Sequence, residues 1–159
     1  MNKLLLLVIF VNLTMNGQKN LPNVTLSTLE GKKISIKNVA QKEDRLYILT
    51  FWATWCGPCI TELDAMSSQY EAWKKEMDVE IIAISIDDSR GQKRVKPLLS
   101  GKKWNYNIYL DTNQDLKRAL SIVSVPYTIV VKNQKIVHIQ NGYVPGSEKQ
   151  LYAKLKALK

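Results

Sequence analysis

Two runs of consecutive apolar residues mark the centre of the chain. Residues 45–52 (RLYILTFW) and 79–86 (VEIIAISI) are almost uninterrupted, a pattern typical of strands covered on both faces of a sheet. After Pro58, apolar side chains recur at intervals of three and four as far as Met77, which predicts a helix over about residues 57–77. The central order is therefore strand, helix, strand.

Shorter elements surround this centre. Residues 23–36 alternate apolar and polar positions on either side of a turn at Glu30-Gly31, which predicts a β-hairpin. No repeat or linker interrupts the chain, so residues 21–159 are expected to form one α/β domain with helices on both sheet faces. The other predicted elements are a helix at 91–99 with Pro97 near its end, a strand at 108–110, a helix capped by Asp111-Thr112 and continuing through Leu120, strands at 127–131 and 135–140 around a turn at Asn133-Gln134, and a C-terminal amphipathic helix docked on the core.

The first seventeen residues, MNKLLLLVIFVNLTMNG, have the form of a secretory signal. Lys3 precedes an apolar run at 4–11, and polar residues follow. As a helix this run is much shorter than the roughly 30 Å hydrocarbon layer of a membrane. We therefore predict that residues 1–17 are a signal peptide that sends the protein to the periplasm or cell envelope. The alternative is an uncleaved membrane tether, because Gly17 offers only a poor cleavage site.

Composition adds one further property, a strong positive charge. Among 159 residues, 23 Lys and Arg face 14 Asp and Glu, so the formal net charge is +9. Such a charge attracts anionic partners in general, whether nucleic acid, anionic lipid or acidic proteins, and does not select among them. No motif specifies nucleic acid, and we expect none as a partner. The apolar share of 45% is that of an ordinary globular domain.

The two cysteines of the chain lie where a buried strand passes into a helix, in the segment WCGPC. Cys56 and Cys59 are three residues apart on the first helical turn, so they share a face and lie within disulfide reach. The helix N-terminus favours a thiolate at Cys56, which we predict to be exposed and to be the attacking sulfur. Cys59, one turn deeper and less exposed, resolves the mixed disulfide. Pro58, after Gly57, is compatible with a first turn because no amide there loses a partner.

Two other uses of this cysteine pair are possible. Half of a zinc site would need two more ligands, and the single histidine, His138, stands alone in a strand-like segment. A purely structural disulfide over so short a loop would restrict the unfolded chain little. Redox chemistry is therefore favoured, and neither a metal nor another cofactor is expected.

These residues resemble the thioredoxin-fold proteins, and within them the TlpA/ResA-like thiol-disulfide oxidoreductases of bacterial envelopes. The resemblance rests on FWATWCGPC at 51–59, on Val125-Pro126 ahead of a late strand, and on LEGKKISI at 29–36. It implies a thioredoxin-like fold, with a central mixed β-sheet flanked by helices and an N-terminal β-hairpin extension. It also implies that Pro126 is cis and faces the sulfurs, and that the backbone at Val125 pairs with a substrate strand.

One position departs from thioredoxin itself. Thr50 stands where thioredoxin has a buried aspartate, and a hydroxyl cannot act there as a general base. ResA-like proteins are similar to this chain in having a glutamate three residues after the second cysteine, here Glu62, which implies a carboxylate that shuttles a proton for Cys59. The alternative is a solvated acid that complements the helix dipole. Trp55 is expected to shield Cys56 and to offer partners an apolar contact.

The dipeptide between the cysteines favours reduction over oxidation. Strong oxidants of this fold usually have a histidine there, which stabilises the thiolate, and Gly57-Pro58 supplies no such charge. The potentials of thioredoxin, about −270 mV, and of the DsbA oxidant, about −120 mV, differ by about 7 kcal/mol for two electrons. We expect a monomeric reductase of envelope protein disulfides, recycled by a membrane electron donor, and the resemblance suggests apocytochrome c as one substrate.

Three alternative functions stay open. The first is a thiol oxidant or isomerase, which uses the same cysteine pair. The second is a peroxiredoxin-like peroxidase, although residues 51–55 have neither the proline nor the spacing that precede a peroxidatic cysteine. The third is a non-catalytic binding module that keeps only the fold, which the intact cysteine pair disfavours.

Overall fold

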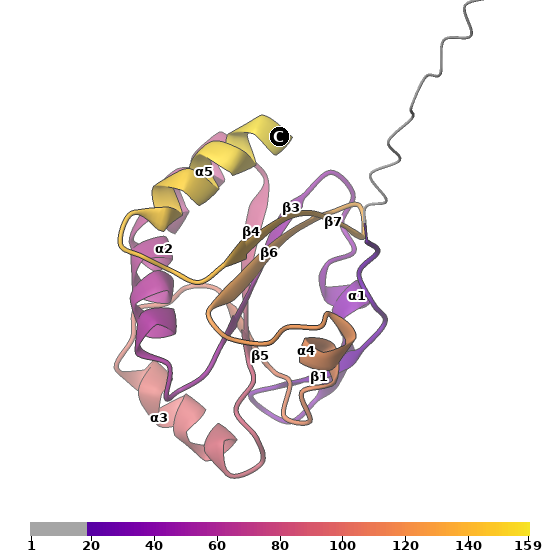
Figure 1. The fold of residues 1–159 in the computed structure, drawn as a ribbon, viewed down its shortest axis with the longest axis vertical. Helices are drawn as coiled ribbons and strands as arrows, with labels where there is room; N and C mark the ends of the chain where they lie inside the picture. Colours follow the sequence, from indigo (N-terminus) through magenta and orange to yellow (C-terminus); the bar gives the residue numbers. More distant parts are fainter. Residues whose placement is uncertain (1–18) are drawn as a thin grey trace, which may run out of the picture.

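A seven-stranded mixed β-sheet runs through the computed structural model, which describes residues 19–159 (Figure 1). The predicted signal peptide at 1–17 lies outside the described residues. The strands stand in the order β2-β1-β5-β4-β3-β6-β7. Their bounds are β1 Thr25–Thr28, β2 Lys33–Ser35, β3 Leu46–Trp52, β4 Val79–Ser85, β5 Asn107–Leu110, β6 Tyr127–Lys132 and β7 Lys135–Asn141.

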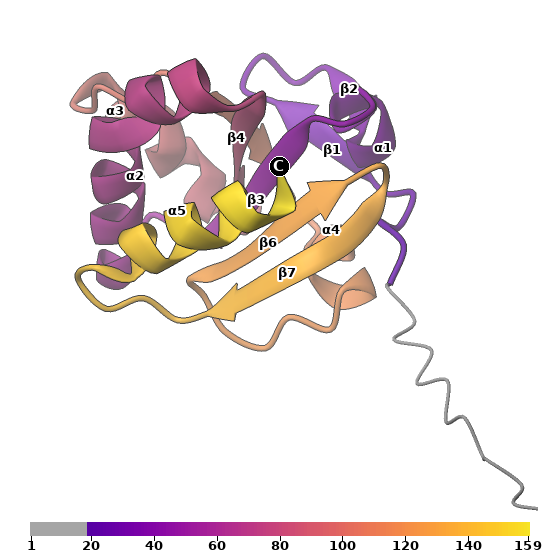
Figure 2. The same ribbon diagram turned by 90° about the horizontal axis from the view of Figure 1, so that it is seen from above.

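Helices cover both faces of this sheet. Figures 1 and 2 show α2, α3 and α5 on one face and α1 and α4 on the other. None of the helices in residues 19–159 is both long and apolar enough to cross a membrane. The helices are α1 Ile36–Val39, α2 Gly57–Glu76, the 3₁₀ turn η1 Gly91–Arg94, α3 Val95–Ser100, α4 Asp115–Ala119 and α5 Ser147–Leu158.

The strand predicted to be central is fully buried along its length. All seven residues of β3 are buried, and β3 pairs parallel with β4 on one edge and antiparallel with β6 on the other. Covering both faces explains the continuous apolar run, because a buried Leu, Ile or Phe side chain contributes about 1.5 to 3 kcal/mol relative to an exposed one. This arrangement confirms the predicted mixed sheet flanked by helices.

The N-terminal hairpin is present and extends the sheet. Strands β1 and β2 pair antiparallel, and β1 also pairs antiparallel with β5. Gly31 has a φ of +86° after the turn, in the left-handed region that glycine adopts without steric cost. The second strand ends one residue before the predicted Ile36. The Ser35 side chain accepts a hydrogen bond from the Lys37 N–H at 3.2 Å and so begins the short helix α1.

The segment predicted as one helix at 91–99 is divided into η1 and α3. Pro97 is the third residue of α3, within the first turn, where its missing N–H costs no hydrogen bond, and the helix continues to Ser100. Asp111 caps the next helix as predicted, although α4 begins only at Asp115. The Asp111 carboxylate accepts hydrogen bonds from the N–H groups of Leu116 and Lys117 at 3.2 and 2.9 Å.

The C-terminal helix docks on the core, as its amphipathic pattern predicts. Leu151 and Leu155 of α5 are fully buried, and Tyr152 stacks on Trp73 of α2 with ring centroids 5.7 Å apart. The preceding hairpin turns at Asn133-Gln134, where both residues have positive φ values, as expected for a tight two-residue hairpin loop.

Candidate redox site

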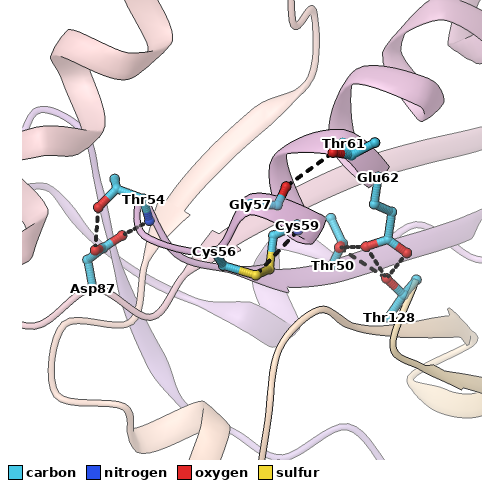
Figure 3. Close-up of a disulfide and its surroundings, with 9 residues drawn as sticks. All are labelled: Thr50, Thr54, Cys56, Gly57, Cys59, Thr61, Glu62, Asp87 and Thr128. Atoms are coloured by element: carbon cyan, nitrogen blue, oxygen red, sulfur yellow. Dashed lines mark hydrogen bonds between the residues drawn. A yellow bond between two sulfur atoms is a disulfide. The ribbon is translucent and has the colours of Figure 1, made fainter. Parts of the chain in front are cut away.

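Cys56 and Cys59 form a disulfide at the N-terminus of α2, with their Cα atoms 5.3 Å apart (Figure 3). Cys56 is the N-cap residue of the helix, and its Sγ accepts a hydrogen bond from the Cys59 N–H at 3.3 Å. One of the unpaired amides of the helix N-terminus therefore points at this sulfur, and the positive end of the helix dipole favours a thiolate there after reduction. The predicted pairing and the predicted place of Cys56 in the helix are confirmed.

The exposure of the two cysteines follows the predicted order but not the predicted degree. Cys59 is 0% exposed and Cys56 only 5%, whereas the sequence led us to expect an exposed Cys56. The expectation was wrong because the loop turns tightly: the Cys56 N–H donates to the Ala53 carbonyl at 3.0 Å, and the residue joins the core. Trp55, by contrast, is 64% exposed.

The bond between Val125 and Pro126 is cis, as the resemblance implies. Tyr127, the next residue, pairs with Phe51 near the carboxyl end of β3. Pro126 therefore lies at the end of the sheet where the chain leaves β3 for the disulfide. Contact of Pro126 with the sulfurs and pairing of Val125 with a substrate stay predictions.

Glu62 lies inside the protein, so the solvated alternative for this residue is wrong. It is 1% exposed, and its carboxylate accepts hydrogen bonds from Thr50 Oγ1 and Gln140 Nε2, both at 3.2 Å (Figure 3 shows the Thr50 side). Thr128 Oγ1 donates to Thr50 Oγ1 at 3.0 Å and lies 3.4 Å from the carboxylate. Thr50 pairs with Thr128, and Thr128 with Gln140, directly across three neighbouring strands. Glu62 thus covers one polar row of the sheet.

Burial determines the ionisation of Glu62. Loss of water contact raises its pKa to about 7, and the hydrogen bonds from Thr50, Thr128 and Gln140 oppose this rise only in part. Within residues 19–159, no Lys, Arg or His forms a salt bridge with this carboxylate. Near neutral pH both protonation states are therefore populated, as proton transfer requires. Thr50 has no carboxyl where thioredoxin has an aspartate, and Glu62 of the facing helix α2 brings a carboxyl to this place.

Sequence reasoning missed Asp87, which directly follows Ile86 after β4. Its carboxylate accepts the Thr54 N–H at 2.8 Å and the Thr54 hydroxyl at 2.7 Å (Figure 3), and also the Ser85 hydroxyl at 2.8 Å. Thr54 precedes Cys56 by two residues, so Asp87 holds the loop that carries Cys56. An aspartate immediately after a buried strand was the available signal, but only the pairing of β3 with β4 places it beside this loop.

Comparison with known proteins agrees with this geometry. Residues 18–139 match the AhpC/TSA family along most of the chain. The chain belongs to the AhpC/TSA family.

Within residues 19–159 of this AhpC/TSA protein, no cluster of three or more His, Cys, Asp or Glu is arranged to hold a metal ion. A surface cavity of about 590 Å³ is lined by residues at the carboxyl end of α2, among them Lys74 and Glu76, and the disulfide does not line it.

Two curated relatives of this chain are named as thiol-disulfide oxidoreductases. Thiol-disulfide oxidoreductase ResA of Bacillus subtilis is 30% identical over 122 residues, which cover 76% of this chain and 65% of ResA. Sporulation thiol-disulfide oxidoreductase A of the same organism is 32% identical over 111 residues, covering 69% and 64%. The matches thus span slightly less than two thirds of these two curated relatives.

A solved structure supports the same grouping. A thioredoxin-like protein from Porphyromonas gingivalis superposes with a TM-score of 0.75 and 39% identity, covering 87% of this chain and 90% of that one. The thioredoxin-like fold and the resemblance to ResA-like proteins, both predicted from the sequence, are confirmed for this AhpC/TSA protein.

The buried Glu62 predicts a pH-dependent stability. Its pKa in the folded state, about 7, exceeds the ordinary 4.5, so its contribution is fully present below pH 4.5 and is lost as the pH rises through 7. The unfolding free energy of the wild type should therefore fall between about pH 5 and pH 8. The Glu62→Gln variant has no ionisable group at this position, so its unfolding free energy should fall by about 2 kcal/mol less over the same range. Urea unfolding of the oxidised protein at both pH values measures this. Glu43→Gln, at an exposed glutamate, serves as the control, and equal pH dependence in Glu62→Gln and wild type would contradict the prediction.

Proposed function

We propose that this protein is a thiol-disulfide oxidoreductase that reduces disulfides of proteins in the cell envelope. The observation that carries the proposal is the Cys56–Cys59 disulfide at the start of α2, with Cys56 as the N-cap residue. The names of the curated relatives, thiol-disulfide oxidoreductases, support the same activity.

The exchange proceeds in two steps from the reduced protein. The Cys56 thiolate attacks one sulfur of the substrate disulfide, forms a mixed disulfide and releases the first substrate thiolate, which takes up a proton. Cys59 then loses its proton, attacks Cys56 Sγ and releases the second substrate sulfur as a thiolate, which takes up a proton. Two electrons and two protons pass to the substrate, and the protein returns to its disulfide. With the Cα atoms 5.3 Å apart, the second step needs no backbone movement.

Glu62 supplies the proton acceptor for the second step in this proposal. Cys59 is fully buried, so bulk water does not reach its thiol freely. Glu62 lies three residues further along α2, on the same helix face, with a pKa of about 7. Its carboxylate accepts the proton of the Cys59 thiol as that sulfur attacks, while Thr50 and Gln140 hold it in place.

The substrate is held from both sides of the disulfide in this proposal. Trp55, with 64% of its surface exposed, provides an apolar contact next to Cys56. Gly57 and Pro58 are exposed at the first turn, and nothing lies within 4 Å of the position that a Cβ on Gly57 would take, so a partner chain can approach closely. On the far side, the backbone at Val125, before the cis Pro126, pairs with the substrate strand.

We further propose that the protein works in the reductive direction. Export through residues 1–17 places it in the periplasm or envelope, where a membrane electron donor recycles the disulfide and apocytochrome c is one substrate. It acts as a monomer. Gly57-Pro58 provides no cation to stabilise the Cys56 thiolate, and this favours a reductant over an oxidant or isomerase.

The activity is tested by trapping its intermediate. Cys59→Ser removes the resolving attack, so we expect it to retain substrate proteins covalently through Cys56, and dithiothreitol should release them. Affinity capture of this variant from envelope extracts followed by mass spectrometry identifies the adducts. Cys56→Ser serves as the control and should retain none. Absence of adducts from a folded Cys59→Ser protein, together with steady peroxide consumption by the wild type without a thiol substrate, would point to a peroxidase instead.

The reduction potential of the cysteine pair tests the direction. We expect a value nearer to about −270 mV than to about −120 mV, because the loop lacks a histidine between the cysteines. Equilibration with glutathione or dithiothreitol buffers, followed by thiol labelling, measures it. The double variant Gly57→Pro with Pro58→His should raise the potential, because the introduced imidazole stabilises the thiolate. A wild-type value at the oxidising end of this range would contradict the reductive direction.

The role of Glu62 is tested by turnover. Glu62→Gln should slow insulin-disulfide reduction by about 10-fold to 100-fold, because water is excluded from the buried Cys59 and replaces the carboxylate poorly. The wild-type rate should rise as the pH passes 7 and Glu62 ionises, and the variant should lose this rise. Alkylation of Cys56 and the rate of Glu43→Gln serve as controls. A Glu62→Gln variant with the wild-type pH profile would show that this residue is structural only.

A further inference from the structure

The connection between β4 and β5 concentrates positive charge. Residues 88–103 contain six Lys and Arg against one Asp, so they contribute five of the nine net positive charges in about a tenth of the chain. Four of these cations are exposed on or next to η1 and α3, and we call them the basic surface: Arg90, Lys93, Arg94 and Lys96.

Most of the basic surface forms no salt bridge. Among residues 19–159, Arg90, Lys93 and Lys96 form no salt bridge, and Arg94 only approaches the buried Asp87 at 3.9 Å. The carboxylate of the neighbouring Asp88 accepts hydrogen bonds from the backbone N–H groups of Arg90 and Gly91. Several cations elsewhere are paired at 2.8 Å or less, among them Lys42, Lys74 and Lys102.

The basic surface is fixed beside the loop that leads to the disulfide. Arg94 Nε donates to Thr54 Oγ1 at 3.3 Å, and Thr54 is held in turn by Asp87. The backbone at Gly91 packs so closely that a Cβ there would lie 2.9 Å from Asp87 Oδ1, and Val95 is fully buried. The segment is therefore anchored to the core and does not hang free in solvent.

This anchoring places Arg94 within electrostatic reach of an incoming substrate. Thr54 and Cys56 are two residues apart, so their Cα atoms are separated by no more than about 7 Å. Charges interact over about 8 Å at physiological ionic strength before screening becomes strong. A protein whose disulfide reaches Cys56 therefore brings the residues around that disulfide near Arg94, the cation of the basic surface that contacts Thr54.

We propose that the basic surface binds an acidic segment next to the disulfide of the substrate protein, and thereby selects substrates with Asp or Glu in that position. The inference rests on the proposed reduction of protein disulfides. An acidic protein segment is favoured over a lipid surface because one substrate can occupy the basic surface and reach Cys56 together. Complementary charge of this kind acts mainly on the rate of association.

The test compares two synthetic peptides that contain the same disulfide loop, flanked either by Asp and Glu or by Ser and Gln. Single-turnover oxidation of the reduced protein by each peptide is followed in a stopped-flow instrument. We expect the acidic peptide to react about 10-fold faster at low salt, and this preference to fall to about 2-fold near 0.5 M salt. Insulin reduction is measured in parallel as a report on the disulfide exchange itself.

Charge reversal locates the effect. Lys93→Glu with Lys96→Glu changes two exposed residues outside the redox site and should remove the preference for the acidic peptide while leaving the neutral one unchanged. Lys135→Glu with Lys154→Glu makes the same change in net charge on exposed residues of β7 and α5, and should keep the preference. Circular dichroism and the rate of Cys56 alkylation check that both variants fold.

Three results would overturn the proposal. Equal rates for both peptides, with insulin reduced normally, would remove the basic surface from substrate choice and leave the proposed function intact. Failure to reduce either peptide or insulin would remove the proposed function, and the inference with it. Salt-sensitive binding to phosphatidylglycerol-containing vesicles that Lys93→Glu with Lys96→Glu abolishes, without any peptide preference, would identify the basic surface as a lipid site.

Discussion

The pairing of β3 on both of its edges is the constraint on which the redox site depends. On one edge, Trp52 lies opposite Ser85 of β4, which brings Asp87 to the loop before the cysteines. On the other edge, Thr50 lies opposite Thr128 of β6, which brings the cis Pro126 to the same end of the sheet. A one-residue slip on either edge would turn every side chain of the slipped strand to the other face and disperse the site. Close packing of the side chains on both faces of β3 opposes such a slip.

The same pairing explains why a glutamate is tolerated in the core. Thr50, Thr128 and Gln140 form a polar row across three strands, and buried hydroxyl and amide groups are costly unless they find hydrogen-bond partners. Glu62 provides acceptors for this row from the facing helix. The absence of a paired cation among the described residues keeps its pKa near 7, so the arrangement that satisfies the core also retains a proton near Cys59. Structure and proposed chemistry depend here on the same contacts.

The sequence was sufficient where the physical cause is local. The apolar runs at 45–52 and 79–86 predicted β3 and β4 to within a residue, because burial on both faces leaves a continuous pattern. The cysteine spacing predicted the disulfide because two residues three apart on a helical turn are neighbours in space. The burial of Glu62, the near burial of Cys56 and the role of Asp87 were beyond local patterns. The burial of Glu62 and the role of Asp87 depend on which strands are neighbours in the sheet, and the burial of Cys56 depends on the tight turn of its loop onto the core. A periodicity of two or 3.6 residues carries neither kind of information.

Two carboxyl groups near the cysteines bear on the direction of electron flow. Asp87 holds the loop before Cys56, and Glu62 lies one helical turn beyond Cys59. Negative charge near a thiolate raises its free energy, and a less stable reduced form is a stronger reductant. Arg94 offsets part of this effect near Cys56, at 3.9 Å from Asp87, but its side chain is 64% exposed and therefore well screened. In the described part of the chain no cation forms a salt bridge with Glu62. The negative charge that Glu62 gains as the pH rises therefore acts on Cys59 with little screening. These carboxyl groups act against the helix dipole and the cations of the basic surface, which favour the Cys56 thiolate, so the reduction potential depends on the balance between the two sets of charges.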